Sequence, residues 1–180
     1  MSAPAEHHVR LRDGTDVVIR PFQAIPRKDI DKAYAGLSPQ SRYHRFLAVV
    51  PRLTDEMLHH LVDEIDGVNH IALVVVRSPD RGPESIIGIG RIIRYPHEPT
   101  RADVAVTIRD EWQGRGAATA LLEALMQHRP DGVDEIVTSV AADNPAALAM
   151  LQRLGEFRAT PAGIDTLDVT VKIGQHNSHS

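Results

Sequence analysis

The chain has 180 residues, a length that fits one compact domain with a substantial core and gives no reason to expect a second. Its 20 Lys and Arg against 24 Asp and Glu give a formal charge of −4, which disfavours a nucleic-acid partner or an anionic membrane surface. The chain has no apolar run long enough to cross a bilayer and no recognisable signal peptide, so we expect a cytoplasmic protein. Cysteine is absent, so disulfides are excluded.

The first half of the chain predicts a strand, three helices and a hairpin. A β-branched run at residues 16–21 is the opening strand, and residues 26–47 have helical composition interrupted by a Ser-Pro step, which predicts two short helices. A capping threonine and an acidic first turn begin a third helix at residues 54–65. Two β-rich runs, 70–77 and 85–94, flank a turn with Pro and Gly and predict an antiparallel hairpin.

The second half alternates strands with helices, as α/β domains do. Alternating apolar and polar side chains mark one strand, which leads into a glycine turn, and leucine-rich stripes mark the helices. The ends, residues 1–12 and 174–180, are expected to be flexible parts of a single domain that spans 1–180. The expected elements are strands at 102–108, 135–140 and 166–173 and helices at 118–125 and 147–154.

Ten histidines make a metal site worth considering. Adjacent pairs occur at His7-His8 and His59-His60, and two more lie among small polar residues at 176–179. The tail pair has no acidic or sulfur neighbour, and metal sites need a defined spacing of ligands. We therefore expect no resident metal.

The main chemical signal is a run of small residues where the fourth predicted strand meets a helix. Small side chains let the main chain approach a ligand closely, and the N–H groups at a helix start favour an anion such as pyrophosphate. Arg115 adds a cation for phosphate, although glycines that serve the turn conformation alone are an alternative. The candidate phosphate-binding residues are Gln113, Gly114, Arg115, Gly116, Ala117 and Ala118.

This turn resembles motif A of the GNAT superfamily of N-acetyltransferases, whose pattern Gln/Arg-x-x-Gly-x-Gly/Ala is matched by Gln113, Gly116 and Ala118. Residues 142–148 and 154–157 resemble the family's next strand-to-helix junction and its closing Leu-Gly-Phe. The resemblance implies a GNAT-like α/β fold, in which helices flank a mixed, twisted sheet that is split between the fourth and fifth predicted strands. It also implies an acyltransferase that uses acetyl-CoA as cosubstrate and an amine as acceptor.

Residues 37–46 resemble the acetyltransferase domain of bacterial protein lysine acetyltransferases, although two amphipathic helices with a Ser-Pro cap explain the segment equally well. The resemblance implies transfer to a protein lysine. Two alternatives stay open because a fold does not fix its acceptor pocket: acetylation of a small amine, and acyl-CoA binding without catalysis. Dimers are common in this family, so a homodimer is a further expectation.

The resemblance further implies that the amine attacks the thioester directly while a main-chain N–H polarises the carbonyl. By position that N–H belongs to Val106, and Val106, Thr107 and Ile108 line the pantetheine arm. The amine must lose a proton before it attacks, so a carboxylate is expected. Asp103 stands where such enzymes often have Glu, one methylene longer, which favours proton transfer through water; a solvent-facing strand carboxylate is the alternative.

Two further positions bear on the chemistry. Leu151 stands where many family members place a tyrosine that protonates the leaving thiolate, so that acid is absent; a thiol titrates at about pH 8.5, and the thiolate can leave without it. Asn144 is a candidate CoA contact, and its alternative role is to cap the helix that begins at Pro145. Secondary candidates for proton transfer are Tyr43, Tyr95, His70 and His97.

Overall fold

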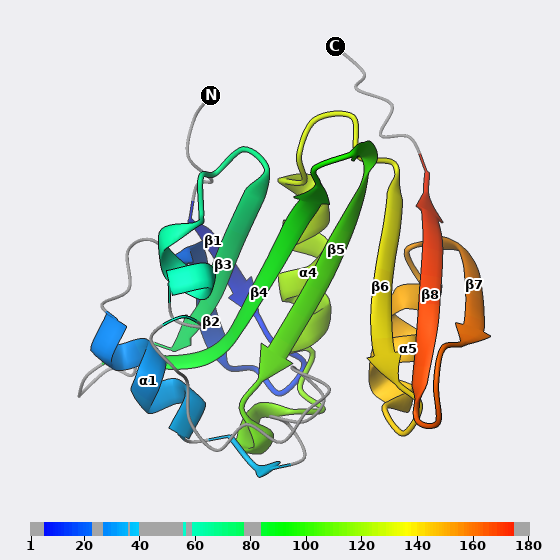
Figure 1. Cartoon of the computed structure of the whole chain (residues 1–180). Coiled ribbons are helices and arrows are strands. Elements are labelled where there is room, and N and C mark those ends of the chain that lie inside the picture. The colour runs from blue at the N-terminus through cyan, green and yellow to red at the C-terminus, as the bar shows by residue number, and fades with distance from the viewer. Residues whose placement is uncertain are drawn as a thin grey trace.

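The computed structural model describes residues 6–22, 27–35, 37–39, 56, 59–77 and 84–174. Within them, eight strands form one mixed sheet in the order β1-β2-β3-β4-β5-β6-β8-β7 (Figure 1). The strands are β1 His7–Arg10, β2 Asp16–Pro21, β3 His70–Arg77, β4 Ser85–Tyr95, β5 Glu98–Ile108, β6 Glu135–Ala141, β7 Gly155–Pro161 and β8 Thr166–Ile173. The helical elements are α1 Arg27–Ala35, the π-helical turn η2 His59–Asp63, the 3₁₀ turn η3 Asp110–Trp112, α4 Ala117–Gln127 and α5 Pro145–Gln152.

Helices lie on both faces of the sheet, as the sequence predicts. Figure 1 shows α4 and α5 on one face and α1 on the other. Neighbouring residues of β3 point to opposite faces: Leu73 joins the core beneath α4, whereas Val74 packs with Phe22 and Ile30 on the α1 side. A strand buried on both faces is apolar at consecutive positions, which explains the continuous apolar run of β3.

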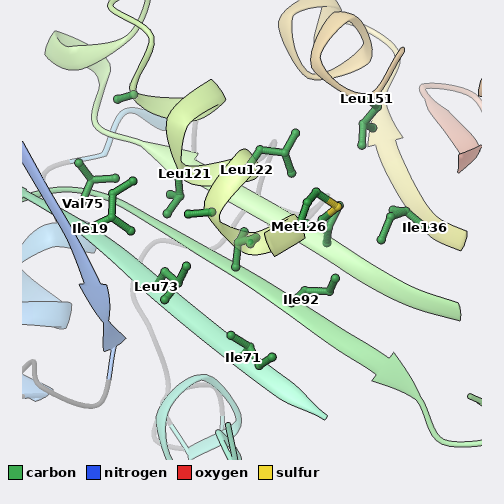
Figure 2. Close-up of a cluster of buried hydrophobic side chains, with 14 of the residues drawn as sticks. Ile19, Ile71, Leu73, Val75, Ile92, Leu121, Leu122, Met126, Ile136 and Leu151 are labelled. Carbon is green, nitrogen blue, oxygen red and sulfur yellow. The ribbon is translucent and has the colours of Figure 1, made fainter. Parts of the chain in front are cut away.

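Helix α4 sits close to the sheet because a glycine lies beneath it. A Cβ on Gly90 of β4 would lie 2.8 Å from Leu125 Cδ1 and 3.0 Å from Leu121 Cγ. Figure 2 shows Leu121, Leu122 and Met126 of α4 directed at the strands. This close packing fixes the start of α4 relative to the end of β5.

The sheet is split between β5 and β6, as the resemblance implies. These two strands run parallel and pair only at Arg101↔Glu135 and Ala102↔Ile136, whereas β6 pairs with β8 from Glu135↔Lys172 to Ala141↔Thr166. Beyond Ala102 the two strands diverge, and the gap widens toward the carboxyl end of β5 (Figure 1). The predicted α/β fold class with a split sheet is therefore confirmed.

Two edge strands were not predicted. Residues 7–10 fall in the N-terminal segment expected to be flexible, but they form β1, which pairs with β2 from His7↔Ile19 to Arg10↔Asp16. The sequence did not predict this strand, because four alternating residues give a weak local signal until a partner strand is present. β7 pairs with β8 and was interpreted from the sequence only as a closing Leu-Gly-Phe motif.

The helices predicted between residues 26 and 65 are described only in part. The first corresponds to α1, most of the second lies outside the described residues, and the third is described at Glu56 and from His59 onward, where η2 lies. No helix in the described ranges is long and apolar enough to cross a membrane. In those same ranges, His, Asp and Glu side chains do not gather in groups of three or more that could hold a metal ion.

Candidate active site

The small-residue turn between β5 and α4 has the geometry of an anion site. Gly114 and Gly116 adopt left-handed conformations, with φ of +76° and +93°, which glycine tolerates without strain. α4 begins at Ala117, and its N-cap residue, Gly116, has no side chain that could cap the main-chain N–H groups of the first turn. Those N–H groups, together with the helix dipole, are therefore directed at the space in front of the turn, which suits a phosphate.

The side chain of Gln113 stabilises the turn through a hydrogen bond to β5. Its Nε2 donates to the main-chain oxygen of Ile108 at 3.1 Å, and this bond ties the turn to the last residue of β5. The sequence predicts that Gln113 binds the cofactor, and its side chain does line the cleft described below. Its hydrogen bond shows that it also shapes the turn.

Arg115 is directed away from the space in front of the turn. Its Nη1 lies 3.0 Å from Asp13 Oδ2, and its guanidinium lies 4.5 Å from the centre of the Trp112 ring. The Thr15 main-chain N–H, with a smaller contribution from Arg115, holds the pKa of Asp13 below its usual value. Arg115 thus fastens the segment after β1 to the turn.

A different arginine, Arg12, faces the turn, and no sequence pattern predicted it. A Cβ on Gly116 would lie 3.1 Å from Arg12 Nε, and the Arg12 main-chain N–H donates to Arg115 O at 3.1 Å. Arg12 is about 100 positions before the turn, and the pairing of β1 with β2 brings its segment there. Local sequence patterns cannot detect a contact of that range.

Two clefts meet at the split in the sheet. The first, about 470 Å³, extends from the turn to the start of α5 and is lined by Arg12, Thr107, Ile108, Gly116, Ala118 and Asp143, among others. The second, about 250 Å³, is lined by Tyr95, Asp103, Leu122, Thr138, Ser139 and Leu151, among others. Val106, Asn144, Ala147 and Met150 line both. The predicted site residues other than Arg115 therefore surround one continuous groove.

The main-chain N–H of Val106 points into the split. Arg109 N–H donates to Ile87 O on β4 at 2.8 Å, in continuation of the β4–β5 register, and bonded pairs alternate along an antiparallel ladder. Alternate residues of β5 therefore face β6. Two hydrogen bonds support this orientation of Val104 and Ile108. Val104 O accepts from Thr138 Oγ1 at 3.2 Å, and Ile108 O accepts from Gln113 Nε2 at 3.1 Å. Val106 lies between them.

Side chains span the split where main-chain pairing has ended. Besides the bond from Thr138 Oγ1 to Val104 O, Tyr95 Oη donates to Val137 O at 2.8 Å. Burial, together with the negative charge of Asp103, Glu98 and Asp168, raises the pKa of Tyr95 to about 12. Tyr95 therefore keeps its proton near neutral pH, and it is a poor candidate for a general base.

Asp103 and Leu151 lie together at the second cleft. Asp103 is half-buried on β5, and Leu151 of α5 is buried in the core beneath α4. The position that the resemblance gives to a proton-donating tyrosine is thus apolar. The candidate base is a carboxylate at the cleft wall.

Asn144 caps α5, as one of its two expected roles requires. Its Oδ1 accepts from the main-chain N–H of Ala147 at 3.3 Å, with Pro145 following as the first helical residue. The residue also lines both clefts. The cap holds the start of α5 beside the groove.

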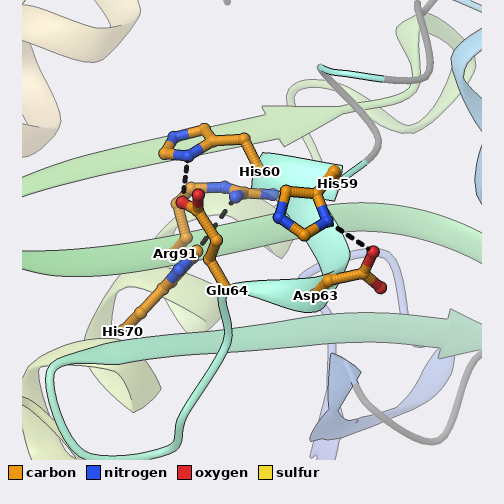
Figure 3. Close-up of polar contacts among 6 residues, drawn as sticks. All are labelled: His59, His60, Asp63, Glu64, His70 and Arg91. Atoms are coloured by element: carbon orange, nitrogen blue, oxygen red, sulfur yellow. Dashed lines mark hydrogen bonds and ion pairs between the residues drawn. The ribbon is translucent and has the colours of Figure 1, made fainter.

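His70, a secondary candidate, belongs to a separate polar cluster on the α1 side of β3 and β4 (Figure 3). Burial, then the positive charge of Arg91, lowers the pKa of His70 to about 4. Its Nε2 lies 3.3 Å from Arg91 Nη1, so the neutral ring accepts from the guanidinium. His59 bonds Asp63 at 2.8 Å, and His60 bonds Glu64. His70 lines neither cleft, and Tyr43 lies outside the described residues.

Comparison with known proteins agrees with this geometry. A family model described as an acetyltransferase (GNAT) domain matches residues 16–156. Acetyltransferase Pat of Mycolicibacterium smegmatis is 32% identical over 151 residues, which cover 82% of this chain. An acetyltransferase of Pseudomonas aeruginosa is 31% identical over 146 residues, which cover 81% of this chain and 77% of that protein. The chain therefore belongs to the GNAT acetyltransferase family, as the sequence predicts.

Solved structures show the same fold. The GNAT domain of S. lividans PAT superimposes with a TM-score of 0.79 over 93% of this chain and 97% of that chain, at 24% identity. A cAMP-binding acyltransferase from Mycobacterium smegmatis gives a TM-score of 0.63 at 26% identity, over 95% of this chain and 48% of that one. The chain also spans only 43% of the length of Mycolicibacterium smegmatis Pat.

Proposed function

We propose that the chain transfers the acetyl group of acetyl-CoA to an amine, preferably the side chain of a protein lysine. The observation that carries this proposal is the meeting of two features in one groove. At one end lie the uncapped start of α4 and Arg12, and at the other lies the Val106 N–H, directed into the split. A phosphate-bearing thioester needs both an anion site and a donor for its carbonyl oxygen.

The residues present fit acetyl-CoA. The N–H groups of Gly116, Ala117 and Ala118 and the Arg12 guanidinium would hold the pyrophosphate, and the side of β5 from Val106 to Ile108 would hold the pantetheine arm. A solved acetyltransferase structure from Salmonella typhimurium, described with its cofactor acetyl-CoA, has the same fold, with a TM-score of 0.64 at 17% identity.

In the proposed reaction, the Val106 N–H donates to the thioester oxygen as negative charge develops there. Asp103, through a water molecule, accepts a proton from the acceptor ammonium, and the free amine attacks the carbonyl carbon. A new C–N bond forms, the nitrogen gives its second proton to solvent, and the C–S bond breaks. Leu151 lines the groove at the position that many family members give to a proton-donating tyrosine. CoA therefore leaves as the thiolate and takes its proton from solvent.

The charge around the second cleft supports a cationic acceptor. Asp103 lines this cleft, and Glu98 and Asp168 lie close enough to Tyr95, another residue of its wall, to help raise the pKa of that side chain. A lysine ammonium is favoured beside such groups. Similarity to Pat, and the resemblance of residues 37–46 noted above, favour a lysine within a protein over a free amine.

Two other functions remain as alternatives to test. The carboxylates favour a polyamine or an aminoglycoside as well as lysine. Leu151 in place of the family's tyrosine, and Asp103 in place of its Glu, also suit a module that binds acyl-CoA and does not turn over. Thiol release from acetyl-CoA distinguishes the three, with acyl-CoA synthetases, lysine peptides, amino acids, polyamines and aminoglycosides as acceptors. The chain has no cysteine, so it adds no background to a thiol reagent.

Release that depends on a protein lysine supports the proposal, and the acetylated residue is then located by mass spectrometry. Release with small amines alone moves the function to the first alternative. If calorimetry shows acetyl-CoA binding but no acceptor gives thiol, the binding module is favoured.

A further inference from the structure

The open space in front of the phosphate turn continues on the side of the turn away from the split. A third cleft, about 340 Å³ and here called the α4 cleft, lies along α4 between the segment after β1 and the end of α5. Its lining includes Leu11, Arg12, Thr119, Ala120, Glu123 and Arg153, and none of its lining residues belongs to β5 or β6. The α4 cleft shares with the first cleft Arg12, Gly116, Thr119 and Arg153. The two clefts therefore meet at the turn.

The covalent structure of CoA suits two clefts that meet at a phosphate site. Its pyrophosphate separates the pantetheine arm from an adenosine that carries a further phosphate on its 3′ oxygen. In the proposed function, on which this inference rests, the arm runs from the turn along β5 toward Val106. The adenosine then lies on the other side of the turn, where the α4 cleft begins.

The arginines near the turn fall into two groups. Arg10 bonds Asp16 at 3.0 Å and Arg115 bonds Asp13 at 3.0 Å, so a carboxylate already compensates each of these charges. Among the residues that the structure describes, no carboxylate forms an ion pair with Arg12 or Arg153. Two uncompensated guanidinium groups thus line the clefts, and such groups attract anions.

Helix α5 directs Arg153 toward α4. Ala146, Met150 and Arg153 follow one another at intervals of four and three residues and all line the first cleft, so they share one face of the helix. The helix itself, Pro145–Gln152, carries no charged side chain. Arg153, which is exposed and follows α5 directly, therefore supplies the positive charge at this end of the cleft.

The position of Glu123 limits where a phosphate can lie in the α4 cleft. Glu123 is exposed on α4, one turn beyond Thr119, and its carboxylate repels a phosphate. The same carboxylate can accept a hydrogen bond from an adenine amino group or a ribose hydroxyl. A phosphate in this cleft is therefore favoured at Arg153 rather than farther along α4.

We propose that Arg153 binds the 3′-phosphate of CoA and makes the site selective for CoA over dephospho-CoA, which lacks that group. A phosphate monoester carries a charge of about −1.5 to −2 at neutral pH, and a guanidinium group can bind it through two parallel N–H···O bonds. Arg12 and the N–H groups of α4 bind the pyrophosphate, which both molecules possess. The two arginines therefore have different tasks: Arg12 sets the affinity for either molecule, and Arg153 sets the preference between them.

Two ligands and a few variants measure this preference. Calorimetry gives the dissociation constants of CoA and dephospho-CoA for each protein. The wild type should bind CoA about tenfold or more tightly than dephospho-CoA, and Arg153→Ala should lose this difference by weakening CoA binding alone. Arg153→Lys keeps the charge without the planar fork and should retain part of the preference. Arg12→Ala should weaken the binding of both ligands by the same factor.

Arg158→Ala is the matched control. It also removes one exposed arginine, but Arg158 lies on β7 and lines none of the three clefts, so both affinities should stay unchanged. Thermal melting checks that each variant folds. Equal wild-type affinities for CoA and dephospho-CoA, or equal weakening of both by Arg153→Ala, would overturn this inference and leave the proposed function in place. A wild-type protein that binds neither ligand contradicts both.

Discussion

In the proposed function, single residues divide the groove between a phosphate-binding end and an acceptor end. Arg12 and the uncapped N–H groups of α4 form the first, and Asp103 with Tyr95 forms the second, with the Val106 N–H between them. The roles are therefore separable by substitution. A change at one end should alter cofactor affinity, and a change at the other should alter the rate of transfer.

Asp103→Asn should lower the rate of acetyl transfer by about a hundredfold below the pKa of the acceptor amine, and less above it, because the variant cannot accept the ammonium proton. Acetyl-CoA affinity should hardly change. The rate is measured by thiol release across a pH series. Asp168→Asn is the matched control, since this carboxylate also lies near Tyr95 but bonds Ser139 Oγ at 3.0 Å. Normal turnover of Asp103→Asn at low pH would exclude it as the base.

Arg12→Ala should weaken acetyl-CoA binding by about tenfold or more, because charge-assisted hydrogen bonds to phosphate are lost. Arg115→Ala is the informative comparison. The sequence favours Arg115 as the phosphate contact, but its side chain binds Asp13 and covers Trp112. Calorimetric affinities decide between them: a larger loss with Arg115→Ala would show that this side chain swings to the phosphates when the cofactor binds.

At the scale of elements, the conformation of the turn between β5 and α4 determines where α4 begins. Gly116 gives the turn a left-handed residue, and Gln113 ties it to β5. The glycine pattern predicted this turn because its requirements are local. Arg12, β1 and β7 were missed because their signals depend on strands far away in the sequence. The split was predicted only through the family resemblance, since no local pattern indicates where two strands stop pairing.

Gly116→Ala should reduce acetyl-CoA affinity by at least about tenfold, since the new methyl group is strained at φ +93° and lies 3.1 Å from Arg12 Nε. Gly132→Ala controls for strain alone, because Gly132 has φ +83° in a turn with nothing within 4 Å of the added Cβ. Both variants should lose similar stability in urea unfolding. Equal affinities for acetyl-CoA would place the pyrophosphate elsewhere.

For the whole molecule, two cores on opposite faces of one sheet carry the stability, and the groove is confined to the place where that sheet opens. The α1-side core is the smaller of the two clusters in the described residues. It lies beside the polar cluster of His70 and Arg91, whose side chains are both buried. Stability should therefore respond to the protonation of His70.

The free energy of unfolding should fall as pH decreases from about 6.5 toward 4. The pKa of His70 is about 4 in the folded chain and about 6.5 when unfolded, so the unfolded chain binds more protons in this window. The loss should be on the order of 2 kcal/mol, and His70→Leu should remove it. Urea titrations at pH 7 and pH 5 measure the difference. An equal pH dependence in the variant would assign the loss to other groups.

The position of Arg12 links the N-terminal strand mechanically to the cofactor turn. Arg12 follows β1 by two residues and is held to the turn by a main-chain bond to Arg115 O at 3.1 Å, with Asp13 and Arg115 as a second fastening. β1 and the start of α4 are therefore held together, so a displacement of this edge strand would move the turn with it.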